Sequence, residues 1–198
     1  MNIKKTAVII IDMINDFASK DGSLFVEDSL RTISPIKSVA EFVLDKGGAV
    51  FYVNDLHQPN DKEFESWSPH AVFDTDGAKI VDDLNLNPWD PLSSKIQNNK
   101  FGTRCIVLPK STYDAFQDTQ LEYFLNRMNL DHLILVGTVS NICVLSTLHS
   151  AFFKNYKTTI INNCISSLDP KGMEVLQYQA INVYKSNILE TFEDLEIT

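Results

Sequence analysis

Short apolar segments, each too brief for a helix, alternate along this chain with longer segments of helical periodicity. The segment Thr6–Ile11 (TAVIII) is apolar or β-branched throughout, which is typical of a strand buried on both faces of a sheet. The other expected strands are Ala49–Asn54, Cys105–Leu108, His132–Val136, Thr158–Ile161 and a last one near Ser186–Leu189. The helices expected between them are Pro35–Lys46, Thr119–Met128, Asn141–Lys154 and Pro170–Ile181.

This alternation of strands and helices predicts the fold class. Parallel strands joined by right-handed helical crossovers form a sheet with helices on both faces. We therefore expect an α/β protein, a three-layer α/β/α sandwich with a doubly wound, mainly parallel sheet. The length of 198 residues fits one domain that spans residues 1–198, because the sequence shows neither a repeat nor a linker.

Local signals set the expected limits of several elements. Ser34 is the expected N-cap of the first helix, a proline follows it, and Gly47 is the expected stop. Pro109 is expected to close the third strand. Residues 55–100 are rich in Asn, Asp, Pro and Ser, with weak helical character only over Gly77–Leu84. A connection of this length predicts a functional loop.

Charge and hydropathy exclude several classes of partner. A net charge of −9 and a pI near 4.8 argue against nucleic acid and anionic membrane surfaces, which attract basic patches. No apolar run is long enough for a transmembrane helix. The first apolar run is interrupted by Asp12 and lacks a cleavage site, so we interpret it as a buried strand and expect a cytoplasmic protein. Three cysteines are too few for a disulfide scaffold.

Ligands of open parallel sheets bind at the carboxyl ends of the strands, and reactive residue types gather there in this sequence. Cys143 lies in GTVSNICV, a strand–turn–helix junction where free N–H groups and the helix dipole lower a thiol pKa and can hold an oxyanion. Cys143 is therefore a candidate nucleophile, and the alternative is a buried structural cysteine. Cys105 and Cys164 are expected to be structural.

Two further residues at this edge could act with the thiol. Asp12 ends an apolar strand, where burial raises a carboxyl pKa and suits it to act as a general base. The alternative is that Asp12 is a turn or capping aspartate, and Asp16, four residues later, is an equally plain candidate. Lys110 follows the third strand and would stabilise a neighbouring thiolate, although most lysines are solvated. The shared position of Cys143, Asp12 and Lys110 favours one site.

A third group of residues has the chemistry of a metal site. Asp55 and His57 point to the same side of an extended segment, and the loop that follows allows Glu63 and His70 to fold back. Two imidazoles and two carboxylates suit Zn²⁺, Mn²⁺ or Fe²⁺ better than Ca²⁺ or Mg²⁺. The spacing matches no zinc-finger or HExxH pattern, so the alternative of unrelated polar loop residues stays open.

Taken together, five segments of this chain resemble the isochorismatase-like cysteine hydrolases, and in particular the nicotinamidase/pyrazinamidase group. In chain order the segments are VIIIDMINDF, NDLH, EFESWSPH, LPKSTYDAF and GTVSNICVLST. The resemblance implies the three-layer α/β sandwich expected above. It also implies that Cys143 is the nucleophile, that Asp12 is the base and acid, and that Lys110 completes the triad.

The same resemblance implies further residue roles. A cis peptide precedes the residue that matches Val139, which turns the N–H groups of Val139 and Cys143 into an oxyanion hole. Asp55, His57 and His70 match metal ligands, and Glu63 stands where many nicotinamidases have a third histidine. The implied aromatic lining of the substrate pocket is Phe17, Trp67 and Phe116.

The activity that follows from the resemblance is the hydrolysis of nicotinamide to nicotinate and ammonia, a step of NAD salvage, with Zn²⁺ favoured over Mn²⁺ or Fe²⁺. The alternatives are a cysteine amidase acting on an N-carbamoyl or ureido compound and a non-catalytic metal-binding protein. Cys143 argues against isochorismatase activity itself. The implied partner is a small amide, and a homo-oligomer is common in the family. This chain departs from the usual GTPG at Asp74–Gly77 (DTDG) and over Asn85–Asn99.

Overall fold

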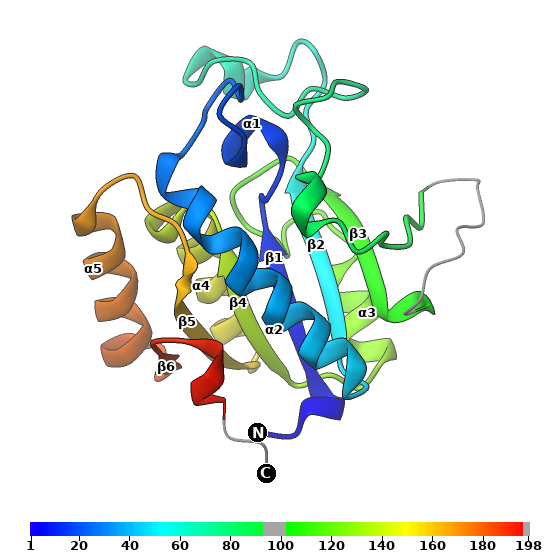
Figure 1. Cartoon of the computed structure of the whole chain (residues 1–198), viewed down its shortest axis with the longest axis vertical. Helices are drawn as coiled ribbons and strands as arrows, with labels where there is room; N and C mark the ends of the chain where they lie inside the picture. The colour runs from blue at the N-terminus through cyan, green and yellow to red at the C-terminus, as the bar shows by residue number, and fades with distance from the viewer. Residues whose placement is uncertain (93–101, 196–198) are drawn as a thin grey trace.

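Six parallel strands form the central sheet of the computed structural model, which describes residues 1–92 and 102–195 (Figure 1). Their order across the sheet is β3-β2-β1-β4-β5-β6. The strands are β1 (Thr6–Ile11), β2 (Ala49–Asp55), β3 (Cys105–Lys110), β4 (His132–Gly137), β5 (Lys157–Ile165) and β6 (Asn187–Leu189). The sheet confirms the predicted doubly wound α/β class.

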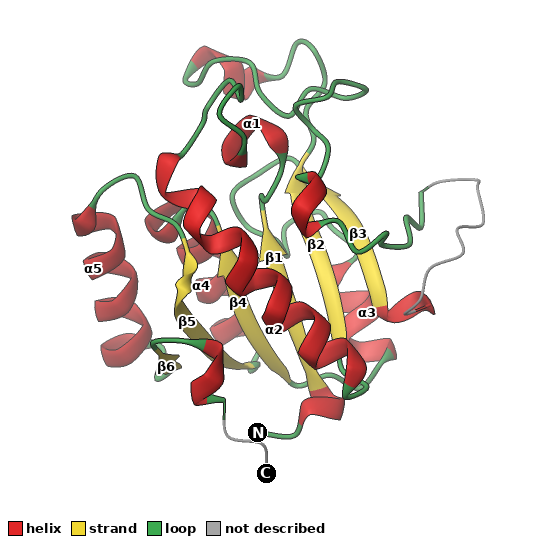
Figure 2. Ribbon diagram, in the orientation of Figure 1, coloured by secondary structure: helices red, strands yellow, loops and turns green. Residues whose placement is uncertain are grey.

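Helices cover both faces of this sheet (Figure 2). The α-helices are α1 (Asn15–Ala18), α2 (Ile33–Asp45), α3 (Leu121–Arg127), α4 (Leu145–Phe153) and α5 (Pro170–Tyr178). Successive residues of β1 face opposite sides, so Val8 and Ile10 pack with α2, while Ile9 and Ile11 pack with α3, α4 and α5. Every residue of β1 is buried, as expected of a strand between two helical layers.

Several element boundaries differ from the predicted ones. Ser34 is not the N-cap of α2, because the 3₁₀ turn Glu27–Thr32 runs directly into the helix and places Ser34 inside its first turn. Pro109 does not end β3, which continues to Lys110. An edge strand tolerates proline because one of its sides has no partner strand that needs the N–H. Only the last residues of the weakly helical segment form a 3₁₀ turn, Asp82–Leu84.

Two other predicted features are placed by the structure. Gly47 follows the end of α2 with a φ of +86°, the left-handed conformation that glycine adopts most easily, so it terminates the helix as expected. The start of the predicted helix Asn141–Lys154 lies in a π-helical turn, Ser140–Val144, which leads into α4. The unusual stretch Asn85–Asn99 lies outside the described residues beyond position 92.

The strand order positions the functional edge of the sheet. The chain adds β2 and β3 on one side of β1, then crosses to add β4, β5 and β6 on the other. The register pairs Ile11 with Val53 and with Gly137, so the carboxyl ends of β1, β2 and β4 are level. Ligands of doubly wound sheets bind where the winding direction reverses, here between β1 and β4. Within the described part of the chain, no helix is long and apolar enough to span a bilayer.

Candidate active site

Cys143 lies at the reversal point of the sheet, in the π-helical turn between β4 and α4. The peptide bond between Thr138 and Val139, just after β4, is cis. Cys143 is 7% exposed, and together with Val139 it lines a cavity of about 350 Å³. The predicted strand–turn–helix junction is therefore present, and it places the Cys143 thiol in the lining of a cavity.

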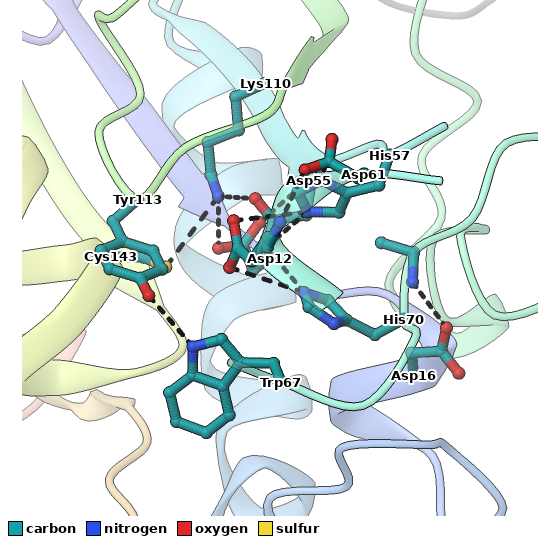
Figure 3. Close-up of polar contacts among 12 residues, drawn as sticks. Asp12, Asp16, Asp55, His57, Asp61, Trp67, His70, Lys110, Tyr113 and Cys143 are labelled. Carbon is teal, nitrogen blue, oxygen red and sulfur yellow. Dashed lines mark hydrogen bonds and ion pairs between the residues drawn. The ribbon is translucent and has the colours of Figure 1, made fainter. Parts of the chain in front are cut away.

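Lys110 contacts the other two predicted reactive residues, Asp12 and Cys143, at the edge of the sheet where β1, β3 and β4 end (Figure 3). Its ammonium nitrogen lies 2.7 Å from Asp12 Oδ2 and 3.9 Å from Cys143 Sγ, and it donates a hydrogen bond to Asp55 Oδ1. Asp12 also accepts a 2.8 Å hydrogen bond from the backbone N–H of Asp55. The side chains of Lys110 and Asp12 are almost fully buried, so one cation holds two carboxylates and contacts the thiol.

Burial and neighbouring charges shift the pKa values of these residues. Burial, reinforced by the charge of Asp55, raises the pKa of Asp12 to about 6 against the opposing effect of Lys110. This confirms the raised pKa predicted for Asp12. Burial alone would lower the pKa of Lys110, but the charges of Asp12, Cys143 and Asp55 outweigh it and raise that pKa, so Lys110 is a permanent cation.

The expectation of a lowered thiol pKa is wrong. Burial raises the pKa of Cys143 well above its usual range, and the carboxylates of Asp12 and Asp55 add to this, while Lys110 opposes it only in part. The resting group is therefore a neutral thiol beside a carboxylate whose pKa is near 6. A thiol of this kind needs a base to take its proton, and Asp12 is placed to be that base.

Four donor groups meet at the carboxyl end of β2, next to the triad. Asp55, His57 and His70 are buried, and one ligand atom of each lies within 4.8 Å of the others. The Nε2 atoms of His57 and His70 lie 3.9 and 3.8 Å from Asp55 Oδ2, and 4.0 and 3.9 Å from the Glu63 carboxylate. Two donors about 2.1 Å from one ion are at most about 4.2 Å apart, so these distances suit a shared ion.

The second nitrogen of each imidazole also fits a metal site. His57 Nδ1 lies 3.1 Å from Asp61 Oδ2, and His70 Nδ1 lies 2.8 Å from the carbonyl oxygen of Ser68. Metal-binding histidines are oriented by such acceptors, which leave Nε2 free to bind the ion. His57 Nε2 is buried and has no hydrogen-bond partner among the described residues. A buried polar atom without a partner is unusual, and a bound metal ion would supply the missing partner.

The charge at this place also favours a cation. Burial disfavours the charged imidazolium form of His57, but the neighbouring carboxylates of Asp55, Asp61 and Glu63 outweigh this effect. They raise the pKa of His57 to about 9. The same carboxylates would stabilise a divalent ion. The residues present therefore fit a metal of the kind that accepts both nitrogen and oxygen ligands.

Asp16, the second aspartate that the sequence offered beside Asp12, fixes the loop that carries His70. Its Oδ2 accepts a 2.7 Å hydrogen bond from the N–H of Ala71 (Figure 3). Its Oδ1 accepts one of 3.1 Å from the N–H of Ser23. A Cβ atom at Gly77 would lie 2.1 Å from the Asp16 carboxylate. The glycine of the DTDG segment thus makes room for the residue that holds the loop.

The cavity lining includes only part of the predicted aromatic set. Phe17 and Trp67 line the cavity, as predicted. Phe116 does not: it stacks on Tyr156 at a centroid distance of 5.7 Å and packs in the hydrophobic core. Sequence reasoning missed Tyr113, which lines the cavity and accepts a 3.0 Å hydrogen bond from the Trp67 indole N–H. The motif LPKSTYDAF contains both Tyr113 and Phe116, so spacing alone could not separate them.

The two remaining cysteines are core residues, as predicted. Cys105 and Cys164 are both fully buried on the face of the sheet that α2 covers. Burial raises the pKa of each thiol to about 12. Neither is close to the reactive form at neutral pH.

Comparisons with known proteins agree with this geometry. The protein-family model of the isochorismatase domain matches residues 6–105 and 102–188 of the chain. A solved nicotinamidase/pyrazinamidase from Bacillus subtilis superposes with a TM-score of 0.83 at 29% identity, over 94% of this chain and 100% of that structure.

Two curated relatives are similar over most of their length. An isochorismatase family protein of Bacillus subtilis is 27% identical over 85% of this chain and 90% of its own length. A ureidoacrylate amidohydrolase of Caulobacter segnis is 28% identical over 86% of this chain and 76% of its own length.

Proposed function

Since this chain belongs to the isochorismatase family of hydrolases, we propose that it is a metal-dependent cysteine amidohydrolase that converts nicotinamide into nicotinate and ammonia. The observation that carries this proposal is the contact of Lys110 with Asp12, Asp55 and Cys143. Through Lys110, the proposed nucleophile Cys143 and the proposed base Asp12 are linked to Asp55, the first residue of the donor cluster. In this proposal residues 1–198 act as one catalytic domain on a small amide.

The first step is the activation of the thiol. Asp12 takes the proton of Cys143, and the Lys110 ammonium, 3.9 Å from Sγ, balances the charge of the thiolate that forms. The raised pKa of Asp12 suits it to hold that proton at neutral pH. The thiolate then attacks the carboxamide carbon and forms a tetrahedral oxyanion.

The N–H groups of Val139 and Cys143 are the proposed donors to this oxyanion, and each donor of this type is worth roughly 3 kcal/mol in comparable sites. The C–N bond then breaks, and ammonia leaves with the proton that Asp12 had taken. The product on the enzyme is a thioester of Cys143. Asp12 next takes a proton from water, the hydroxide attacks the thioester carbon, and nicotinate leaves as Cys143 regains its proton.

Asp55, His57, Glu63 and His70 are the residues that would hold the metal. When bound, a divalent ion supplies a coordination position that a pyridine nitrogen can occupy, so that the carboxamide is oriented toward Cys143. The remaining orientation comes from aromatic side chains: Phe17, Trp67 and Tyr113 line the cavity and offer flat surfaces to a planar ring.

The test is an assay of ammonia release from nicotinamide by the metal-loaded protein, with Cys143→Ala as the matched control. We expect turnover by the wild type, loss of turnover in the variant, and a large decrease after complete removal of metal by a chelator. Release of ammonia from N-carbamoyl or ureido compounds but not from nicotinamide would assign the other amidase activity. Cysteine-independent turnover, or none with any amide, would contradict the proposal.

A further inference from the structure

Asp16 joins two separate segments that line the cavity. One carboxylate oxygen accepts the hydrogen bond from Ala71, the residue after His70, and the other accepts the bond from Ser23 (Figure 3). The backbone carbonyl of Asp16 also accepts a 3.0 Å hydrogen bond from the N–H of Leu24. Ser23, Leu24 and His70 are part of the cavity lining, whereas Asp16 itself is not. One carboxylate behind the cavity therefore holds two parts of its wall.

Ala71 is the residue through which this carboxylate reaches the donor cluster. Ala71 is fully buried and has a φ of +47°, a left-handed conformation that a residue with a side chain keeps only when its surroundings hold it there. Its N–H bonds to Asp16, and its carbonyl oxygen accepts a 2.9 Å hydrogen bond from the N–H of His57. Ala71 is thus joined to two candidate metal ligands, to His57 by a hydrogen bond and to His70 by the peptide bond.

Gly77 fixes the Asp16 carboxylate from the side away from these bonds. The φ of Gly77 is not positive, so its backbone conformation does not by itself demand glycine. Space does: a Cβ atom at this position would lie between 2.1 and 2.5 Å from the three nearest atoms, all of the Asp16 carboxylate. The Gly77 carbonyl oxygen also accepts a 2.9 Å hydrogen bond from the N–H of Asp16. The carboxylate therefore has little room to shift.

We propose that Asp16 is a positioning residue that couples metal binding to the cavity wall at Ser23 and Leu24. The inference rests on the proposed function, because it concerns the metal ligands and the cavity of the same site. In the metal-loaded protein His70 is held in place, and Ala71 with it, so the Asp16 carboxylate is held and in turn holds the wall. Coupling of this kind is reciprocal, so an ordered wall also raises the affinity for the metal.

Titration with Zn²⁺ against a competing chelator gives the first measurement. Asp16→Asn keeps the shape of the side chain, but its amide nitrogen cannot accept a hydrogen bond, so one of the two bonds is lost. We expect the affinity for Zn²⁺ to fall about 10-fold, the lower end of the effect of removing a group that orients a ligand. Asp76→Asn is the matched control, because it removes the same charge from an exposed side chain and should change the affinity by less than about twofold.

Gly77→Ala tests the same contact without changing a charge. The added methyl group must displace the Asp16 carboxylate, so the affinity for Zn²⁺ should again fall about 10-fold. In an Asp16→Ala background the three atoms that this methyl group meets are absent, and Gly77→Ala should then change the affinity by less than about twofold. Equal losses in both backgrounds would mean that strain at position 77 weakens the site, and would overturn the inference.

Amide hydrogen exchange measures the coupling directly. In the wild type, saturation with Zn²⁺ should slow exchange in peptides that contain Ser23 and Leu24 at least about 3-fold, because their hydrogen bonds to Asp16 open less often. In Asp16→Ala, saturation with Zn²⁺ should leave the exchange of these peptides unchanged while it still protects the segment that carries His70. The second segment reports that the variant is folded and loaded.

The outcomes separate this inference from the proposed function. Unchanged affinity for Zn²⁺ in Asp16→Asn, even with a lower free energy of unfolding, would make Asp16 a merely structural residue and overturn the inference. No binding of Zn²⁺ by the wild type, or no effect of Zn²⁺ on exchange at Ser23 and Leu24, would also overturn it. None of these measurements uses an amide. Failure to hydrolyse nicotinamide, with the expected affinities and exchange rates, would overturn the proposed function and leave the coupling supported.

Discussion

The backbone N–H of Asp55 donates a 2.8 Å hydrogen bond to the carboxylate of Asp12. This bond fixes the proposed base, directly after β1, to the first residue of the donor cluster, at the end of the neighbouring strand β2. Lys110 contacts both carboxylates, so the proposed catalytic and metal centres share one buried charge network. A substitution at either centre should affect the other, unless it preserves both the shape and the hydrogen bond.

Asp12→Asn tests the proposed base with the least change of shape. The amide oxygen can still accept the hydrogen bond from Asp55, but its nitrogen then faces the Lys110 ammonium and cannot take a proton. We expect kcat for the amide substrate to fall by about 10³-fold, within the range of general-base removal, and metal affinity to change by less than tenfold. Steady-state kinetics and metal titration measure the two quantities.

Asp21→Asn is the matched control, because Asp21 is exposed and lies in the turn after α1. It removes the same charge from the chain and should leave kcat within twofold of the wild type. If Asp12→Asn retained more than a tenth of the wild-type kcat while remaining folded, Asp12 could not be the base.

Asp61→Asn tests the orientation of His57. An amide nitrogen at this position would donate to His57 Nδ1, which favours the tautomer that carries its proton on Nε2, the atom that faces Asp55 and Glu63. Metal affinity should fall 10- to 100-fold, the usual effect of removing such a partner. A competition titration with a chelator measures it. Ser68→Ala is the control, because His70 bonds to the backbone carbonyl of Ser68, which this variant keeps. Equal affinity of Asp61→Asn and the wild type would refute the role of Asp61.

Alkylation should distinguish the three thiols. Cys143 is the cysteine that lines the cavity, whereas Cys105 and Cys164 are fully buried. In the native protein iodoacetamide should modify Cys143 alone, at a rate that rises with pH because burial raises the pKa of this thiol. Peptide mass mapping should show all three sites modified after unfolding in urea. Native modification of Cys105 or Cys164 at a rate similar to that of Cys143 would contradict the assigned positions.

His132 predicts an acid-sensitive contribution to stability away from the active site. Burial, together with the charge of the N-terminus, lowers its pKa to about 4, and its Nε2 contacts Thr159 Oγ1 at 2.7 Å. An unfolded histidine has a pKa of about 6.5, so between pH 6.5 and 4 the unfolded chain binds more protons than the folded one. The neutral imidazole therefore contributes fully above pH 6.5, and this contribution is lost as the pH falls toward 4.

Urea unfolding of the wild type and His132→Gln at pH 7.5 and 4.5 measures this contribution. The wild type should lose on the order of 2 kcal/mol more unfolding free energy than the variant over this interval. Glutamine does not titrate, so it serves as the reference. An identical pH dependence of the two proteins would show that His132 does not carry the effect.

The order of strands and helices could be predicted because the apolar periods are strong and the crossovers are local. The ends of the elements were harder to predict where they depend on residues that are neighbours in space but not in sequence. Pro109 stays in β3 because β3 is an edge strand, a fact that no local pattern contains. β5 extends past its apolar run to Ile165 although Asn162 and Asn163 interrupt the pattern. Asn162 is accommodated there by a hydrogen bond to Glu190.

The candidate site divides in the same way. Residue types at the strand ends predicted that Asp12, Lys110 and Cys143 would meet, and the structure brings them together. The prediction of a lowered pKa for the Cys143 thiol was wrong. Burial and two nearby carboxylates raise this pKa, and both effects arise only once the site is assembled. Asp61 and Tyr113 were missed, because they act through loops whose folding is set by long-range contacts. Phe116 was misplaced for the same reason.

The two edges of the sheet bear on how this protein behaves at high concentration. On the outer side of β3, Trp89 accepts a hydrogen bond from Val107 N–H and donates one to the Cys105 carbonyl, and Pro109 has no N–H to offer. The opposite edge, β6, is only three residues long. Long exposed edges are where sheets of separate molecules join and aggregate. Pro109 thus limits pairing at this edge one residue before Lys110, the buried cation of the candidate site.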